Sequence, residues 1–575
     1  MIEPRYGVLQ TLFSDRVFRI PHYQRFYSWE SRQRADLFAD LRRLAGQGAD
    51  QHHFMATIVC YRTPETKTVG TKLYHIYDIV DGQQRLTTLI ILLKSIELAM
   101  ESGTDDQKEL GQILVKRDGH LILLQTNNAN ERIFNRFIRE GVSPAEADIE
   151  THSDTNLATA ITDCATFASE WAANTKLPEL LSLVLHRLGF VVHDTEDSRA
   201  VYTVFEVLNS RGLAVDWLDK CKSLLMGKAY ELSGSPDVAN AEIQGLQNLW
   251  GQIYRELARE DVPGEEILRV AATLFSGPGA GKPRSAEDSL ELIRSDTDSI
   301  AKPRLISERL LDISRKVTGL HGNVFLGPVT DVLHARILAV ALMLAPGITD
   351  AERKTLIAQW ERVTFRIFGL CGKDARTKVG DYLRLAYKIV TGNADTATCT
   401  QIMVAIKGLG ADYPVDRAVK EGLESKDCYE NSPDLCRYVL WQYEEHLARQ
   451  AGVGATIDEH ERALIWKRQA AESIEHVFPK AAAGVAAWTG KMSRSGEPVQ
   501  DVLLHAGRIG NLVLLPIRIN QQARTKAFAD KKLVYAKHSL RMIREVCEEP
   551  DWTLDEIQSR ETRILDWARQ QWADL

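Results

Sequence analysis

The segment IEHVFPK (474–480), followed later by Asn520, contains three residue types that together can hydrolyse a phosphodiester. A carboxylate such as Glu475 and a carboxamide such as Asn520 can hold one divalent cation, and the neutral imidazole of His476 can deprotonate water. Oxygen ligands in an incompletely filled shell suit Mg²⁺ or Mn²⁺. On an extended strand Glu475 and His476 would point to opposite faces, so a turn or bulge must bring them together. The alternative is an ordinary histidine at the end of a core strand.

Near the N-terminus, the segment IPHYQRFYSWE (20–30) interleaves aromatic residues with Gln24 and Arg25. This mixture suits stacking on bases and hydrogen bonding to a nucleotide or to a DNA backbone. The alternative is a partly buried aromatic turn at the edge of a domain.

A second N-terminal segment, DIVDGQQRLT (78–87), predicts a strand that runs through a glycine turn directly into an apolar helix. Backbone N–H groups at such a helix start can bind a phosphate, and Arg85 adds a bidentate donor. Asp81 could hold a cation or orient a water molecule. A strand-turn-helix without a ligand is the alternative.

A third segment, FEVLNSRG (205–212), places Asn209 and Arg211 on a turn where both could reach a polyanion. Beyond it, Asp216 is expected to cap a helix and Asp219 to lie in its first turn, both with structural roles. The stretch SGPGAGKP (276–283) is not a phosphate-binding P-loop, because its spacing is one residue short and Pro283 replaces the hydroxyl residue. We interpret it as a flexible loop between helices.

The periodicity of the chain predicts the elements that must position these residues. Strands are expected at 53–62, 74–80 and 188–194, and helices at 86–100 and 200–209. The next part is almost entirely helical, with helices expected at 240–260, 264–275, 286–294, 303–318, 329–345, 350–370 and 378–391. After residue 472 the order strand–loop–strand–helix is expected.

Length and composition indicate an ordinary globular protein of two to four domains, with 575 residues, 44% hydrophobic and 26% charged. A net charge of -7 argues against coating nucleic acid through bulk positive charge, although a local basic groove stays compatible with it. The eight cysteines form no C-x-x-C pair, which excludes zinc-ribbon and thioredoxin-type sites and suits a reducing cytosol. Without a signal-like N-terminus or a membrane-length apolar run, we expect a cytoplasmic protein with no membrane partner.

Taken together, E-H-x-x-P, G-N-L-x-L-L and Asn520 resemble the HNH (ββα-metal) nuclease domain of GmrSD-type restriction enzymes. Likewise, Y-Q-R-x-Y-x-W, D-G-Q-Q-R and F-x-x-L-N-S-R-G resemble the ParB/sulfiredoxin-like domain that opens these proteins. Val477, Phe478 and Arg524 depart from the family pattern, which leaves the role of the Arg524 position open.

The resemblance implies an α+β multidomain fold. It comprises a ParB/sulfiredoxin-like α/β domain that binds NTP and senses DNA modification (1–235), a helical connector (236–420) and a helical domain with an embedded HNH motif (421–575). It makes His476 the general base, Asn511 a catalytic-site residue that braces the His476 loop, and Glu475 and Asn520 the metal ligands. The remaining roles are nucleotide binding for Asp81, Gly82, Gln83, Gln84, Arg85, Asn209 and Arg211, modification sensing for Tyr23, Gln24, Arg25 and Trp29, and DNA backbone contacts for Arg524, Lys526 and Lys531.

The implied function is an NTP-regulated endonuclease or nickase for modified double-stranded DNA in a bacterial defence system. The mark is phosphorothioate or a modified cytosine, as in SspE-like or BrxU-like members. The implied cofactors are Mg²⁺ or Mn²⁺ and an NTP, with GTP and UTP as candidates, and the expected assembly is a homodimer. Two alternatives stay open: a nucleotide-gated DNA-binding module with an inactive HNH fold, and a nuclease that acts on RNA.

Overall fold

The structure is a computed structural model of the chain. It describes residues 4–48, 51–116, 121–126, 130–196, 216–260, 262–277, 281–323, 329, 331–426, 428–452, 473–482, 485–492, 503–515, 517–536 and 540–575. The chain forms two compact units, residues 1–272 with 284–319 and residues 273–283 with 320–575. The helical stretch predicted as a separate connector is therefore shared between the two units.

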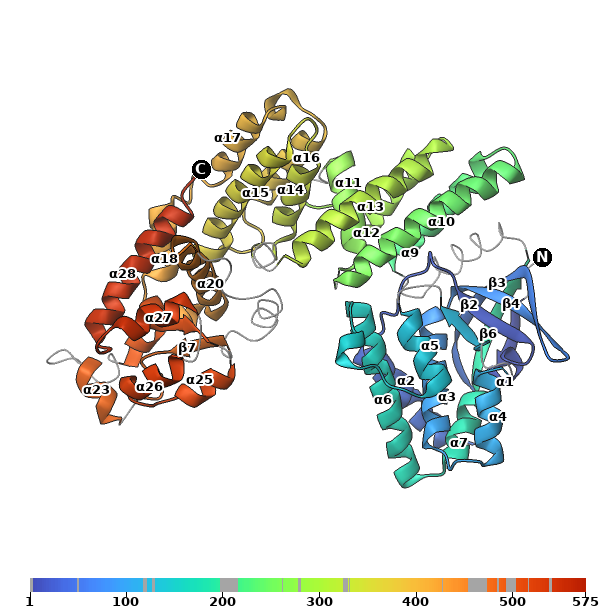
Figure 1. Cartoon of the computed structure of the whole chain (residues 1–575). Helices are drawn as coiled ribbons and strands as arrows, with labels where there is room; N and C mark the ends of the chain where they lie inside the picture. The colour runs from blue at the N-terminus through green and yellow to red at the C-terminus, as the bar shows by residue number, and fades with distance from the viewer. Residues whose placement is uncertain are drawn as a thin grey trace. The chain divides into compact units, whose positions relative to one another are not determined.

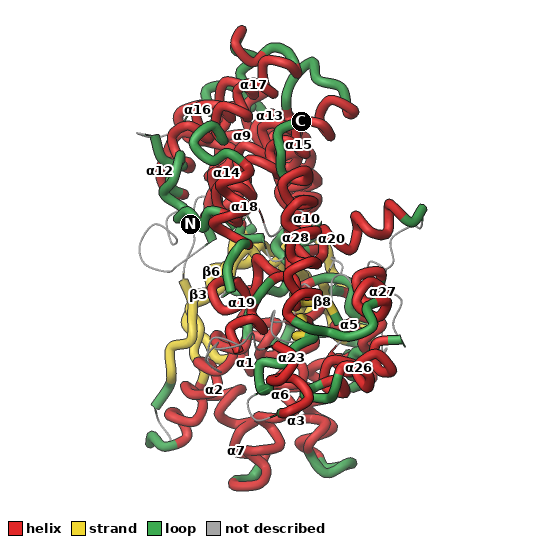
Figure 2. Tube along the Cα trace, turned by 90° about the vertical axis from the view of Figure 1, so that its left-hand side faces the viewer, coloured by secondary structure: helices red, strands yellow, loops and turns green. Residues whose placement is uncertain are grey.

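The N-terminal unit contains a mixed sheet. Its strands are β1 (Pro4–Val8), β2 (Arg16–Ile20), β3 (His53–Val69), β4 (Lys72–Asp81), β5 (Leu124–Thr126) and β6 (Leu188–Thr195). Among the described residues the sheet has six strands in the order β1-β6-β3-β4-β2-β5. β3 pairs with β4 as an antiparallel hairpin and with β6 in parallel, and β3 and β6 run side by side in Figure 2.

Helices cover this sheet and extend beyond it. They are α1 (Leu9–Leu12), α2 (Ser31–Ala45), α3 (Gln83–Ala99), α4 (Asp105–Leu114), α5 (Glu131–Glu140), η1 (Glu146–Asp148), α6 (His152–Asn174), α7 (Leu177–Ser182), η2 (Leu183–Arg187), α9 (Trp217–Leu232), α10 (Pro236–Arg259), α11 (Gly264–Ser276), α12 (Ala286–Asp296) and α13 (Ala301–His321). α3 packs against α6, and α2, α3 and α6 lie together beside the sheet in Figure 1.

α3 is the central helix of this unit. Its first turns and middle are buried on nearly every side, as expected for a helix that is apolar all round. Its start follows Gly82, whose φ of 92° lies in the left-handed region that glycine adopts without strain. The chain therefore turns sharply from the end of β4 into α3, and the D-G-Q-Q-R residues lie at this turn.

The C-terminal unit is mostly helical. Its elements are α14 (Leu333–Leu344), α15 (Asp350–Thr364), η4 (Phe365–Leu370), α16 (Val379–Val390), η5 (Ala394–Thr396), α17 (Cys399–Leu409), α18 (Val415–Leu423), α19 (Cys428–Asn431), α20 (Pro433–Gln450), β7 (Ile474–His476), α23 (Ala486–Met492), η6 (His505–Gly507), η7 (Ile509–Asn511), β8 (Leu512–Leu514), α25 (Ile517–Ala523), α26 (Phe528–Tyr535), α27 (Arg541–Glu548) and α28 (Leu554–Gln571). β7 and β8 form a short antiparallel pair, and α25 follows β8.

The three predicted strands and most predicted helices are confirmed, as is the order strand–loop–strand–helix after residue 472. The predicted helix at 200–209 lies outside the described residues. The P-loop-like stretch falls between α11 and α12, where a loop between helices was predicted, and residues 278–280 within it are outside the described part. None of the described helices combines the length and apolar character needed to cross a membrane.

Candidate functional site

The short β7–β8 pair carries the residues predicted to cleave a phosphodiester. Glu475 lies opposite Val513 and His476 lies opposite Leu512 in an antiparallel register. Because successive side chains of a strand alternate between its faces, Glu475 and His476 point into different surroundings.

The His476 imidazole lies against α19. Its ring meets the Tyr429 ring edge-on with 4.5 Å between the centroids. Burial, followed by the positive charges of Lys480 and Lys531, lowers the pKa of His476 to about 3. Its Nε2 atom is buried and has no hydrogen-bond partner among the described residues. The imidazole is thus neutral at pH 7, as a general base must be, but so low a pKa makes it a weak proton acceptor in this arrangement.

The Glu475 carboxylate is buried on the other face of β7 and is already paired. Its Oε1 accepts hydrogen bonds from Lys531 Nζ at 2.6 Å and from the Tyr535 hydroxyl at 2.8 Å. Lys531 also donates to the His476 carbonyl at 2.9 Å. Burial raises the pKa of Glu475 and lowers that of Lys531, because the interior disfavours both charged forms. The attraction between the two opposite charges acts against both shifts.

This arrangement does not fit the metal predicted between Glu475 and Asn520. The Lys531 ammonium occupies the position beside Glu475 that a cation would need. Asn520, on α25, uses its Nδ2 to donate to the Ile474 carbonyl at 3.1 Å. No group of three or more His, Cys, Asp or Glu residues suited to a metal occurs among the described residues. We therefore derive no chemical step through a metal at Glu475.

Asn511 is fully buried and connects three segments of the chain. Its Oδ1 accepts from the Phe478 backbone N–H at 2.7 Å and from Trp552 Nε1 at 3.0 Å. Its Nδ2 donates to the carbonyls of Phe478 and Ala506. Both ends of the amide are engaged in bonds that hold the loop after His476. Its geometry suits the bracing part of its predicted role, and it touches no reacting group.

The three predicted DNA-backbone residues differ in exposure. Arg524 and Lys526 are exposed, and Arg524 has a left-handed φ of 38°. Lys531 is completely buried in its ion pair with Glu475. The prediction of a DNA contact for Lys531 is therefore wrong for this arrangement, because its ammonium does not reach the surface.

In the N-terminal unit, the D-G-Q-Q-R turn and the loop at 21–30 are bonded to each other. Gln84 Nε2 donates to the Phe26 carbonyl at 2.9 Å, and its Oε1 accepts from the Ser28 N–H at 3.0 Å. Gln83 Nε2 donates to the Arg25 carbonyl at 3.2 Å. Both glutamines are buried, so their side chains hold the aromatic loop in place. Their predicted contact with a nucleotide is not part of this arrangement.

Asp81 and Arg85 flank this turn and are only partly buried. Burial raises the pKa of Asp81 above its usual range, although the Gly82 N–H and Arg85 oppose this shift. Asp81 and Arg85 are therefore the two D-G-Q-Q-R side chains that a ligand can reach. Asn209 and Arg211, the other predicted nucleotide residues, lie outside the described part of the chain.

The residues predicted to sense DNA modification occupy different environments. Tyr23 and Gln24 are buried, and Gln24 donates to the Val80 carbonyl at 3.0 Å. Trp29 is half-buried and packs against the core. Arg25 is also half-buried, with one third (33%) of its side chain exposed.

Arg25 belongs to a buried polar cluster that the sequence analysis did not foresee. Asp219 accepts from the Tyr254 hydroxyl at 2.5 Å and pairs with Lys222 at 3.2 Å and with Arg25 at 3.4 Å. Lys222 also donates to Gln24 Oε1 at 2.9 Å. Burial alone would raise the pKa of Asp219, but Lys222 and Arg25 outweigh it and the pKa is lowered. α9 and α10 thus hold the Y-Q-R loop through this charged cluster.

Asp216 caps α9 as predicted, because its Oδ1 accepts from the Leu218 N–H at 2.8 Å. Lys222 and Tyr254 carry no motif in the sequence. The only signal in the sequence was a lysine, Lys222, at a position where the apolar pattern of the helix predicts a buried side chain. Tyr429 and Tyr535, which contact His476 and Glu475, were equally invisible to motif analysis.

Comparison with protein families gives two matches. The N-terminal domain of the GmrSD restriction endonuclease matches residues 9–226, and the C-terminal domain of GmrSD restriction endonucleases matches residues 413–567. The first match includes the Y-Q-R loop and the D-G-Q-Q-R turn, and the second includes the β7–β8 pair. No curated protein sequence matches the chain.

Proposed function

Because this chain belongs to the GmrSD restriction endonuclease family, we propose that it cleaves modified DNA, with His476 as general base and an NTP bound by its N-terminal unit. The family makes it a restriction-type DNA endonuclease. The dependence on a DNA modification, the NTP and the HNH chemistry are the proposed parts.

The observation that carries the nuclease proposal is the state of His476. Its imidazole is neutral at pH 7, and its Nε2 has no hydrogen-bond partner among the described residues. Such a nitrogen can accept a proton from the water that attacks the phosphorus, while the bond to the leaving oxygen breaks. The Tyr429 ring packs edge-on against the imidazole, and Asn511 holds the backbone of the loop that follows His476.

The nucleotide proposal depends on the start of α3. This helix of 17 residues begins after the left-handed Gly82, and helix N-termini attract phosphate through their unpaired N–H groups and dipole. Arg85 adds a guanidinium on the first turn, and Asp81 adds a carboxylate beside it. These groups suit the binding of a nucleoside triphosphate, which is GTP or UTP by family resemblance.

A plasmid cleavage assay tests the nuclease. Wild-type protein, His476→Ala and the matched control His446→Ala are incubated with unmodified, phosphorothioate and glucosylated plasmid, with NTP and either Mg²⁺, Mn²⁺ or a chelator. We expect His476→Ala to lower the cleavage rate about 10²–10⁴-fold, because a general base contributes this much, while His446→Ala stays active. Equal rates for wild type and His476→Ala would contradict the assignment. The chelator reactions test separately whether cleavage needs a metal, which Glu475 and Asn520 do not hold as they are arranged here.

One observation favours a second candidate function, a nucleotide-gated DNA-binding module with an inactive nuclease fold. The predicted metal ligand Glu475 is neutralised by Lys531 within the protein. The same assay tests this function. It applies if the wild type cleaves none of the plasmids with any of the metals but still binds DNA in an NTP-dependent way.

A further inference from the structure

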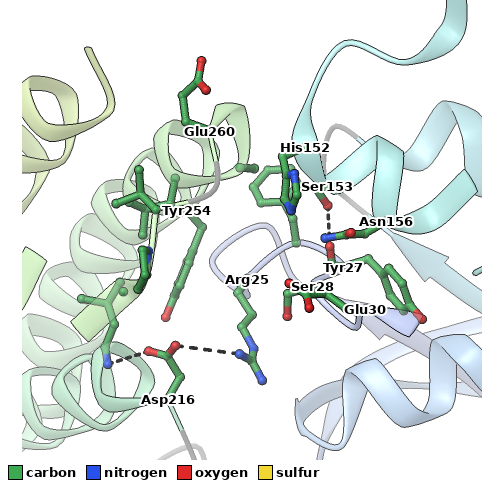
Figure 3. A pocket seen from close by; sticks show the side chains of 17 residues that line it. Arg25, Tyr27, Ser28, Glu30, His152, Ser153, Asn156, Asp216, Tyr254 and Glu260 are labelled. Atoms are coloured by element: carbon green, nitrogen blue, oxygen red, sulfur yellow. Dashed lines mark hydrogen bonds and ion pairs between the residues drawn. The ribbon is translucent and has the colours of Figure 1, made fainter. Parts of the chain in front are cut away.

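A cavity in the N-terminal unit lies beside the Y-Q-R loop and has no assigned role (Figure 3). It is open on one side, has a volume of about 190 Å³ and is lined by the loop at 25–30, the start of α6, the start of α9, the end of α10 and residues 262–264. Cavities that enclose drug-sized ligands have about 300–1,000 Å³. This cavity therefore has room for a single small ring system and not for a whole nucleotide.

Arg25 provides the main hydrogen-bond donors of the cavity. Its guanidinium carries five N–H donors, yet its contacts are two long ion pairs, 3.4 Å to Asp219 and 3.9 Å to Asp216. Among the described residues it makes no side-chain hydrogen bond within ordinary distance. In Figure 3 a dashed line joins the guanidinium to Asp216. A ligand with an acceptor atom would satisfy donors that the protein leaves available.

Asp216 provides an acceptor next to these donors. Its Oδ1 is used by the cap of α9, whereas its Oδ2 faces Arg25. Gly264 closes the wall behind it, because a Cβ atom there would lie 2.8 Å from Asp216 Oδ1. Because Arg25 already faces two carboxylates, a free anion gains little here. The polar wall instead suits a neutral ligand that has an acceptor and an N–H donor side by side.

The remaining walls combine apolar and aromatic side chains, among them Phe26, Leu218, Tyr254 and Leu257, with polar ones. The polar residues are Ser28, Glu30, His152, Ser153, Asn156 and Glu260. Aromatic and apolar walls bind planar rings by stacking, and a base turned out of a duplex is typically read along its Watson–Crick edge in such a pocket. Each of the four bases presents an N–H donor beside an acceptor on that edge.

We propose that this cavity binds one nucleobase, with Arg25 donating to a carbonyl oxygen or ring nitrogen and Asp216 Oδ2 accepting from an N–H group. The choice of a nucleobase among small planar rings rests on the proposed function. The base belongs either to a nucleotide turned out of DNA or to a free nucleotide, and both sources present the same chemistry.

Two variants of the full-length chain test the cavity. Leu257→Trp fills it, and Arg25→Lys keeps the charge but loses the planar fork of donors. Leu305→Trp, at an exposed position on α13, is the matched control. Binding is measured for free nucleosides by calorimetry and for a duplex containing 2-aminopurine by fluorescence. Thermal unfolding confirms that each variant is folded, and Arg25→Lys serves alone if Leu257→Trp does not fold.

We expect both cavity variants to weaken binding about tenfold or more in one of the two measurements, the nucleoside arm or the duplex arm. A lost hydrogen bond to a charged group has an effect of this size. Leu305→Trp should bind as wild type does. Loss in the nucleoside arm identifies a free nucleotide, and loss in the duplex arm identifies a DNA base. Wild-type affinity of both variants in both arms overturns the proposal. Plasmid cleavage is measured in parallel. This distinguishes a protein that binds a base but does not cleave DNA from one that cleaves DNA but has no base site.

Discussion

Lys526 and Lys531 belong to one short segment and have the same side chain, yet their surroundings give them different roles. Lys526 is exposed between α25 and α26, where a phosphate can approach it. Lys531 has no exposed surface and neutralises Glu475. An ammonium that is already paired in the interior is not available to bind a DNA phosphate.

We predict opposite effects for Lys531→Met and Lys526→Met. Lys531→Met should lower the free energy of unfolding by about 3–5 kcal/mol, because it leaves a buried carboxylate without its partner. Lys526→Met should change it by less than about 0.5 kcal/mol but reduce the salt dependence of DNA binding by about one ion. Urea denaturation and salt titrations of DNA affinity measure the two effects. An unchanged urea midpoint for Lys531→Met would show that the ion pair contributes no stability.

His476 should make stability depend on pH. Burial, and then Lys480 and Lys531, lowers its pKa from 6.5 to about 3, so the folded chain binds this proton less readily than the unfolded chain. The stabilising contribution is complete above pH 6.5 and is lost progressively as the pH falls towards 3. We predict that wild type loses more stability than His476→Asn between pH 6.5 and 4. The measurement is the urea midpoint at each pH, and parallel curves would contradict the prediction.

At the scale of elements, the start of α3 and the loop at 21–30 form one bonded assembly. The buried glutamines of D-G-Q-Q-R hold the loop, and the cluster around Asp219 holds it from α9 and α10. The loop is thus tied to the strand-to-helix turn where a phosphate is proposed to bind. A ligand bound at the loop or at the start of α3 would therefore affect the same hydrogen bonds, those of Gln83 and Gln84.

This assembly predicts different consequences for two neighbouring substitutions. Gln84→Ala removes the bonds to Phe26 and Ser28 and should cost about 1–3 kcal/mol, since buried backbone groups lose their partners. Arg85→Ala should leave stability nearly unchanged and lower NTP turnover, because its side chain is partly exposed and makes no hydrogen bond or ion pair with the described residues. Urea denaturation and phosphate release measure both variants. Full turnover in Arg85→Ala would count against its nucleotide role.

At the scale of the whole molecule, the two family matches fall in different compact units. Residues 9–226 belong to the N-terminal unit and residues 413–567 to the C-terminal unit. The chain between the matches is helical and is divided between the units. With a net charge of -7, the chain as a whole does not attract DNA, so we expect DNA binding to depend on local basic groups, for which the exposed Arg524 and Lys526 remain predicted candidates.

Local features of the chain could be predicted from the sequence. The strands at β3, β4 and β6, the Gly82 turn into α3, the Asp216 cap and the order of β7, β8 and α25 all agree with the structure. Each depends on residues close together in the chain, through side-chain periodicity or backbone conformation. The order of the motifs that relates the chain to its family can likewise be read along the sequence without the fold.

Burial and long-range pairing were decided only by the tertiary structure. Lys531 meets Glu475 across 56 residues, and Lys222 meets Gln24 across 198 residues. No local pattern distinguishes a lysine that binds phosphate from one that neutralises a buried carboxylate, because the difference is the dielectric and the partner supplied by distant segments. The sequence therefore identified His476 as a candidate base, whereas folding determined that its neighbour Glu475 is paired with Lys531 and that Arg25 faces a cavity.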